Sequence, residues 1–266
     1  MKNNQRKPNT NYQISKTIKS IIMINIYAFL CLTLLLVTNK TYSQNEELVI
    51  WKNGTAIYSQ STSLEAMDSI TFRKAEVTIC NQVWATRNLD VTTYRNGDPI
   101  PQVTDPTLWA NLTTGAWCYY NNDPANGPIY GKLYNWYAVN DPRGLAPTGW
   151  QVPSYAKWGF LINCLGGVNV AGGKMKSTGI LELGTGLWQS PNVDATNASG
   201  FTGLPEGYRS NDGTFSNIGY GGYWWSSLEY DTTFAWNFAL SYSTGGATNG
   251  VELPKNYGFS VRCLRN

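Results

Sequence analysis

The sequence predicts an α+β domain of mostly antiparallel sheets, with one clear helix, long irregular loops and a small β-rich unit before it. Among 266 residues there are 11 Trp, 17 Tyr and 26 Gly, but only 14% are charged. Many aromatic residues and glycines with few charges are typical of short strands joined by tight turns. Short apolar runs between turn residues recur along the chain, and one stretch has a clear helical period.

Residues 1–43 have the features of a signal peptide. Residues 2–19 are polar and basic, residues 21–37 are mostly apolar, and Thr41 and Ser43 offer small residues at the −3 and −1 positions of a cleavage site. The alternative is an uncleaved anchor, although a 17-residue run is short for a membrane span. In both cases we expect export to the periplasm, the cell surface or the medium, with no membrane contact beyond this segment.

The charge distribution argues against a nucleic-acid binder. Six of the 20 Lys and Arg precede Ser43, whereas none of the 17 Asp and Glu does. Removing these six changes the formal charge from +3 to −3, because 14 basic and 17 acidic residues remain. Nucleic-acid binders carry a basic surplus, so we expect no nucleic-acid partner.

Residues 44–75 are predicted to form the small β-rich unit. Leu48–Trp51 and Thr55–Tyr58 flank an Asn-Gly pair, which is a hairpin signal, and Ser69–Phe72 is a third candidate strand. A unit this small is marginal alone.

The main domain, residues 76–266, begins with a predicted hairpin over Val77–Ile79 and Gln82–Ala85. The clearest helix follows Ser154, since apolar residues recur at helical spacing until Gly166. A short helix is expected after Asp105, where Pro106 suits the first position. Later strands are predicted over Gly207–Arg209, Thr214–Asn217, Tyr223–Ser227, Ala235–Ser241 and Phe259–Leu264. Alternation along a strand places Trp224 and Trp225 on opposite sides.

Four cysteines follow the predicted signal peptide: Cys80, Cys118, Cys164 and Cys263. An even number in an exported protein makes disulfides plausible, and spacing alone leaves all three pairings open. With no His and no CxxC pair, a zinc site is not expected. Asp123, in a polar loop, is a weak calcium candidate because calcium binds carboxylate and amide oxygens, but the loop lacks a run of acidic ligands and a solvated turn before Pro124 is the favoured interpretation.

No residue pattern predicts an enzyme. The absence of His excludes Ser-His-Asp and Cys-His mechanisms. A pair of carboxylates remains conceivable, but most acidic residues stand in turn contexts such as Asp98-Pro99, where Asp bonds its own backbone. We therefore assign no catalytic residue, and calcium is the one conceivable cofactor.

Aromatic residues beside polar, glycine-rich loops are the candidate ligand-binding residues. The aromatic candidates are Trp236, Tyr230, Tyr220 and Tyr242, and the polar candidates beside them are Arg209 and Asn217. Aromatic faces stack on sugar rings, so we expect recognition of a polysaccharide or another surface component, such as a surface protein. The alternative is a structural or protein-interaction module whose aromatic residues lie in the core. A hydrolase or modifying enzyme is a third, weaker hypothesis.

Seven stretches in order carry a family resemblance: residues 77–89, 117–139, 145–158, 165–174, 190–209, 222–227 and 258–266. They include WCYYNNDPANGPIYGKLYNWYAV, GYWWSS and GFSVRCLRN. This part of the chain, about residues 76–266, resembles the Fibrobacter succinogenes major paralogous domain, a family of exported bacterial proteins common in Bacteroidetes. The order of motifs is also similar to the formylglycine-generating-enzyme branch of C-type-lectin-like folds. The resemblance implies a mixed α+β domain whose two ends meet in one sheet.

The chain departs from this family pattern at three informative places. Many members have Cys where Ala146 stands, as a partner for the terminal cysteine. The resemblance therefore implies Cys80 as the partner of Cys263, because the two ends of such a domain meet. Tyr155 replaces a small residue at the helix start, and Glu206 stands where glycine is common.

Overall fold

The computed structural model describes residues 46–52, 55–57 and 69–266, with side chains from residue 75 onward. The predicted signal peptide, residues 1–43, lies outside this range. No helix within the described part of the chain is long and apolar enough to cross a bilayer.

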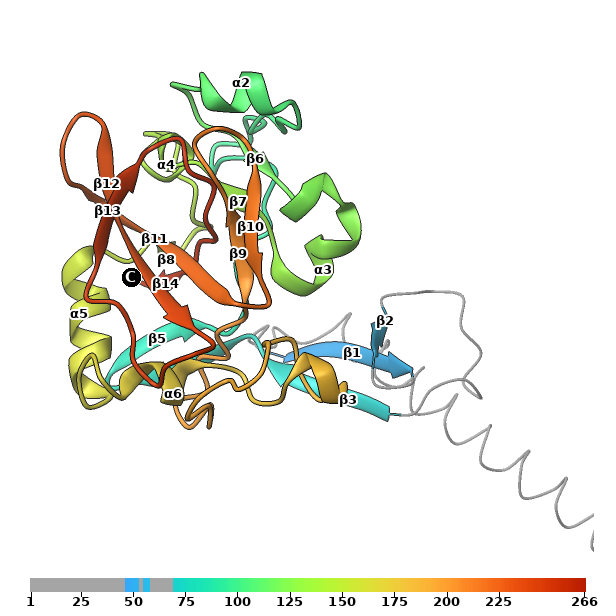
Figure 1. The fold of residues 1–266 in the computed structure, drawn as a ribbon. Helices are drawn as coiled ribbons and strands as arrows, with labels where there is room; N and C mark the ends of the chain where they lie inside the picture. Colours follow the sequence, from blue (N-terminus) through green and yellow to red (C-terminus); the bar gives the residue numbers. More distant parts are fainter. Residues whose placement is uncertain (1–45, 53–54, 58–68) are drawn as a thin grey trace, which may run out of the picture. The chain divides into compact units, whose positions relative to one another are not determined.

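Three short strands form the sheet of the small unit, as predicted. They are β1 (Glu46–Lys52), β2 (Thr55–Ile57) and β3 (Ser69–Lys74). Their order is β2-β1-β3, and both pairs are antiparallel (Figure 1). Ile50 on the central strand faces Ile57 on one side and Ile70 on the other.

A four-stranded antiparallel sheet joins the two ends of the main domain. It has the order β4 (Glu76–Ile79), β5 (Gln82–Ala85), β14 (Leu264–Arg265) and β8 (Trp150–Gln151). Leu264 faces Trp84 on one side and Gln151 on the other. The predicted strand over Phe259–Leu264 is mostly wrong, because Phe259 and Ser260 form isolated bridges and the regular strand begins only at Leu264.

A long hairpin dominates the rest of the domain. Its strands β11 (Gly221–Glu229) and β12 (Phe234–Ser241) pair antiparallel, and β13 (Val251–Pro254) extends the sheet beside β12. Two smaller antiparallel pairs are β9 (Glu206–Arg209) with β10 (Phe215–Ile218), and β6 (Trp117–Cys118) with β7 (Leu133–Tyr134). The sequence did not indicate β13, whose residues lack an alternating pattern.

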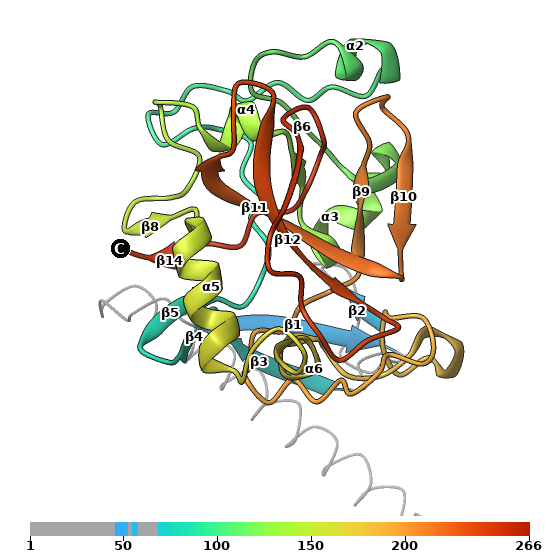
Figure 2. The same ribbon diagram turned by 60° about the vertical axis from the view of Figure 1, so that its left-hand side comes forward.

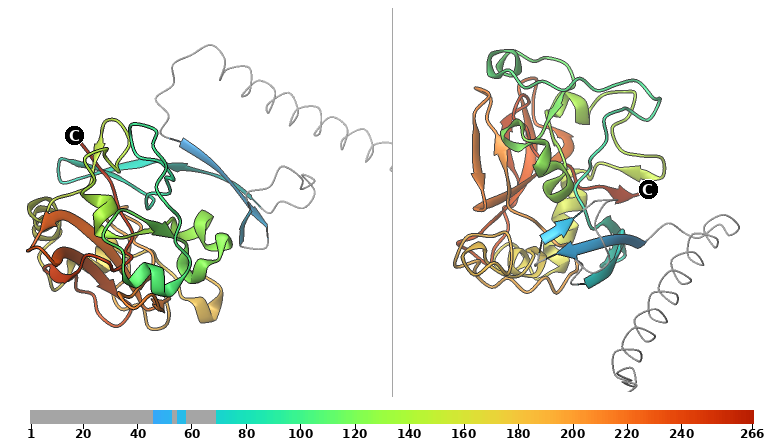
Figure 3. Two further views of the ribbon diagram at one scale, coloured as in Figure 1. Left: turned by 90° about the horizontal axis from the view of Figure 1, so that it is seen from above. Right: turned by 90° about the vertical axis from the view of Figure 1, so that its right-hand side faces the viewer.

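Helices are few and short, which confirms the α+β class. The clearest is α5 (Tyr155–Cys164), which packs on β11 and β12 (Figure 2). The others are α2 (Pro106–Ala110), α3 (Gly127–Tyr130), α4 (Trp136–Val139) and α6 (Ala171–Met175), with 3-10 turns at Tyr120–Asn122, Pro124–Asn126 and Leu181–Leu183. Asp105 caps α2 as predicted, since its carboxylate accepts a hydrogen bond from the Leu108 N–H at 2.8 Å. Long irregular segments link these elements (Figure 3).

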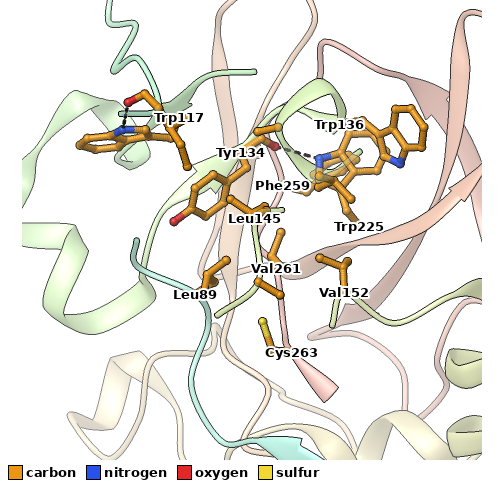
Figure 4. Packing of buried hydrophobic residues seen from close by; sticks show 14 of the residues in the cluster. Leu89, Trp117, Tyr134, Trp136, Leu145, Val152, Trp225, Phe259, Val261 and Cys263 are labelled. Carbon is orange, nitrogen blue, oxygen red and sulfur yellow. Dashed lines mark hydrogen bonds between the residues drawn. The ribbon is translucent and has the colours of Figure 1, made fainter. Parts of the chain in front are cut away.

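Strand β11 separates two parts of the hydrophobic core. Trp225 packs in one cluster with Tyr134, Trp136 and Phe259, and Trp224 packs in the other with residues of α5. Both indoles are buried, so the alternation expected along this strand leads to a second core layer rather than to the surface. The Trp225 N–H donates to the Tyr134 carbonyl at 2.8 Å (Figure 4), which satisfies its one polar group within the core.

The disulfide joins Cys80 to Cys164, so the implied pairing of Cys80 with Cys263 is wrong. Cys80 lies in the turn before β5, whereas the Cys263 carbonyl accepts from Ala85 at the far end of β5. A strand of this length spans about 13 Å, and a disulfide requires Cα atoms within about 7 Å. The Cα atoms of Cys80 and Cys164 are 6.4 Å apart. Cys118 and Cys263 are buried free thiols.

Loss of this disulfide is expected to lower the free energy of unfolding by about 2–4 kcal/mol, because the bridge closes a long loop in the unfolded chain. The bridged residues are 84 positions apart. Urea unfolding should show the loss in a Cys80→Ser, Cys164→Ser double variant. Reductant should destabilise the wild-type protein and leave the variant unchanged. Peptide mapping that finds Cys80 linked to Cys263 would contradict the assignment.

Candidate functional site

The candidate residues fall into two surface groups and one buried residue. Arg209 is the buried one, with no exposed surface, so its assignment as a ligand-binding residue is wrong. Its guanidinium donates to the carbonyls of Val103, Thr104 and Gly213 and lies 4.4 Å from the centre of the Trp109 ring. Arg209 therefore holds loops together from inside, and it cannot reach a ligand.

Trp236 lies at the centre of the first surface group. Its ring is 4.8 Å from that of Tyr155 and 5.2 Å from that of Tyr230, between centroids. Glu252 faces Trp236 across the β12–β13 pair, so their side chains lie on the same side of the sheet. We name Tyr155, Tyr230, Trp236 and Glu252 the tip patch, because they gather near the turn of the β11–β12 hairpin.

Local structure fixes each ring of the tip patch. The Asp231 carboxylate accepts from the N–H groups of Thr233 and Phe234, which closes the hairpin turn that carries Tyr230. Tyr155, the first residue of α5, also packs on the core residue Phe238, with the two ring centroids 5.5 Å apart. Its hydroxyl donates to the Asn249 carbonyl at 2.9 Å. The rings are thus held in place before any ligand arrives, which lowers the entropy cost of binding.

Gly250 lies directly against the rings of the tip patch. It has a φ of +83°, which favours glycine, and a Cβ at this position would lie 2.5 Å from Tyr155 and 3.3 Å from Trp236. A side chain here would push the rings apart. Glycine therefore allows the close approach of the β13 end to the tip patch.

The second surface group lies at the opposite end of the hairpin. Tyr220 and Tyr242 pack edge to face with centroids 5.1 Å apart, and the Asn217 amide donates to the Tyr223 hydroxyl at 2.8 Å. We name Asn217, Tyr220 and Tyr242 the base patch. Along β12, Trp236 of the tip patch and Tyr242 of the base patch are six residues apart, and at about 3.3 Å per residue this is about 20 Å. One sugar unit cannot contact both patches.

The two patches differ in the number of aromatic rings that are held in place at the surface. Tyr230 is 53% exposed and Tyr220 45%, while Trp236 and Tyr242 are partly buried. The tip patch has three rings in contact with one another, whereas the base patch has two, and in each patch one ring (Tyr155 or Tyr242) packs on the core. In the base patch, one N–H of the Asn217 amide is already used by the Tyr223 hydroxyl. The tip patch is therefore the better candidate site.

Tyr155 was absent from the sequence-based set, although a signal for it existed. It occupies a position where the related family has a small residue. A large aromatic residue at the exposed start of a helix adds a surface that the family pattern does not require. The helical period alone gave no reason to place it beside Trp236, since that contact joins α5 to β12.

The strongly shifted buried titratable groups Glu206, Cys118 and Cys263 belong to neither patch. Glu206 is fully buried, and its Oε1 accepts from the Tyr223 N–H at 3.1 Å. Burial raises its pKa to about 8, and the positive charge of Arg262 only partly offsets this. Burial also raises the pKa of the Cys118 and Cys263 thiols to about 12, so both stay protonated at neutral pH and neither supplies a thiolate.

The weak calcium candidate, Asp123, is engaged in a turn. Its carboxylate accepts from the Ala125 N–H at 2.9 Å and starts a 3-10 turn. Nearby, the Asn122 amide donates to the Thr104 carbonyl at 3.0 Å. Across the part of the chain that the structure describes, no group of three or more His, Cys, Asp or Glu side chains is placed to hold a metal ion.

Comparison with known proteins identifies one family. The family model described as Fibrobacter succinogenes major domain matches residues 77–265. The match runs from β4 to β14, the strands that bring the two ends of the domain into one sheet. No curated protein and no solved structure matches the chain.

Proposed function

The chain belongs to the Fibrobacter succinogenes major domain family, and from this premise we propose that it is an exported module that recognises a polysaccharide through the tip patch. The observation that carries the proposal is the partly exposed Trp236 ring, fixed between Tyr155 and Tyr230. Sugar rings stack on such aromatic faces, and a ring that is already fixed loses little entropy on binding.

Export and a C-type-lectin-like fold belong to the same proposal. The Cys80–Cys164 disulfide supports export, because disulfides persist in oxidising compartments. The meeting of β4, β5 and β14 in one sheet supports the lectin-like arrangement. Fold alone does not dictate function, so the tip patch has to be tested directly.

The angles between the rings favour a soluble polysaccharide chain as the ligand over the flat surface of a crystalline polysaccharide. The Trp236 plane is inclined by 60° to Tyr155 and by 88° to Tyr230. Successive sugars on a flat crystal face would need coplanar rings. We therefore expect binding to soluble oligosaccharides and weak retention on crystalline cellulose in a pull-down assay.

Replacing Trp236 with Ala is expected to weaken glycan binding by up to about tenfold, because ring stacking contributes about 0.5–1.5 kcal/mol. The purified protein would be screened on a glycan and plant-polysaccharide array, with and without calcium. Hits would then be measured by calorimetry with the Trp236→Ala variant.

Tyr220→Ala is the matched control, since it removes an exposed aromatic ring from the base patch. Near-UV circular dichroism would verify that both variants keep the native fold. Equal weakening by both substitutions would contradict the tip patch as the binding site. A blank array would remove the carbohydrate proposal and favour a structural module with a protein partner.

A further inference from the structure

The tip patch combines aromatic rings with negative charge. Glu252 is exposed and stands on the same side of the sheet as Trp236. Asp231 is also exposed and follows Tyr230 directly. None of the ion pairs among the described residues includes Glu252 or Asp231. A ligand that stacks on these rings therefore meets a negative rim.

Lys255 also lies at this end of the sheet, but its ammonium group is directed away from the tip patch. Lys255 is only 5% exposed, and its ammonium group binds the Glu229 carboxylate at 2.7 Å and the Thr232 carbonyl at 2.9 Å. It lies 4.8 Å from the centre of the Trp136 ring, which belongs to the core on the β11 side. The register supports this, because Glu229 faces Ala235, whose side chain points away from Trp236. Lys255 therefore offsets Glu229 and leaves the tip patch acidic.

Extending the proposed glycan-binding role, we propose that the tip patch prefers sugars that carry a free amino group over neutral sugars and over uronic acids. An ammonium group is attracted both to the face of an indole ring and to a nearby carboxylate. The Trp236–Glu252 pair offers both attractions at adjacent positions. A uronate would place its carboxylate against the same negative rim and be repelled.

Calorimetry with three oligosaccharides of equal length tests this preference: glucosamine hexamer, N-acetylglucosamine hexamer and galacturonate hexamer. The full purified protein would be titrated at mildly acidic pH, where the amino groups are protonated. We expect the glucosamine hexamer to bind about threefold to fivefold more tightly than the N-acetylated one, as one exposed ion pair allows. The galacturonate hexamer should bind most weakly. Raising the salt concentration should remove the preference.

Two variants test whether the preference comes from the Glu252 carboxylate of the tip patch or from the overall negative charge of the protein. Glu252→Gln should abolish the preference, so that the glucosamine and N-acetylated hexamers bind with equal affinity. Glu182→Gln is the matched control, because Glu182 is an exposed carboxylate that accepts from the Ser190 N–H, and an amide oxygen can replace that acceptor. It should keep the full preference.

The outcomes distinguish this inference from the proposed function. Equal or tighter binding of the N-acetylated or galacturonate hexamer would overturn the amine preference and leave glycan binding intact. A preference that survives in Glu252→Gln or in Trp236→Ala would also overturn it, since the attraction would then come from elsewhere. Failure of all three hexamers and of the wider array to bind would overturn the proposed function, and the inference with it.

Discussion

Replacing Arg209 with Met is expected to lower the free energy of unfolding by about 3–5 kcal/mol, because three backbone carbonyls lose their hydrogen bonds to a buried charged donor. The Arg209 guanidinium bonds Val103, Thr104 and Gly213 at 2.6 to 3.0 Å. Methionine fills similar space and cannot donate. For a domain of this size, such a loss lowers the melting temperature by roughly 10 °C.

Two further variants define what Arg209 contributes. Arg209→Lys keeps the charge, but a single ammonium group cannot serve three carbonyls in the planar geometry of a guanidinium, so most of the loss should remain. Arg143→Met is the matched control, because Arg143 is exposed and pairs with Asp98 and Asp141. It should change the melting temperature far less. Equal melting temperatures for Arg209→Met and the wild-type protein would contradict the structural role of Arg209.

Patterns within one element predicted the local structure well. The hairpin β4–β5, the helix α5 and the strands β11 and β12 follow from alternation, helical spacing and turn residues. Opposite faces for Trp224 and Trp225 followed from the period of a strand, and the structure confirms them. Each of these inferences uses neighbours close in sequence.

Such patterns could not predict contacts between residues that are distant in the sequence. The Arg209 side chain binds carbonyls more than 100 positions earlier in the chain, so its type and its loop context suggested a surface residue. Cys80 pairs with Cys164 because α5 ends beside the first hairpin, which depends on how the helix packs. The same limit applies to the tip patch. Tyr230 and Trp236 were recognised as candidates, but Tyr155 joins them only through the packing of α5 on β12.

Glu206 shows how a departure from the family pattern has a physical consequence. It stands where glycine is common, and the fold buries it completely. Its Oε2 has no hydrogen-bond partner among the described residues. A fully buried carboxylate with one oxygen unpartnered is costly, so the folded protein holds the neutral carboxylic acid. This raises the pKa from 4.5 to about 8 and couples stability to pH.

Raising the pH from 4.5 to about 8 is expected to destabilise the wild-type protein relative to the Glu206→Gln variant. Between pH 4.5 and about 8 the folded state keeps the proton and the unfolded state releases it. The contribution of Glu206 is therefore fully present below the unfolded pKa and declines by up to about 1.4 kcal/mol per pH unit as the pH rises. Burial and the charge of Glu206 raise the pKa of Tyr130 to about 12, so Tyr130 does not titrate in this pH range.

Urea unfolding at a series of pH values measures this difference. Glutamine keeps the acceptor for the Tyr223 N–H and cannot ionise, so any change in packing shifts its curve by a constant amount. The readout is the slope of the difference between the two proteins. Glu182→Gln, at an exposed carboxylate, should retain the wild-type slope. Parallel curves for the wild-type protein and Glu206→Gln would mean that Glu206 is already ionised in the fold. Arg262, the cation whose charge opposes the shift, would then stabilise the buried carboxylate more strongly than its burial disfavours it.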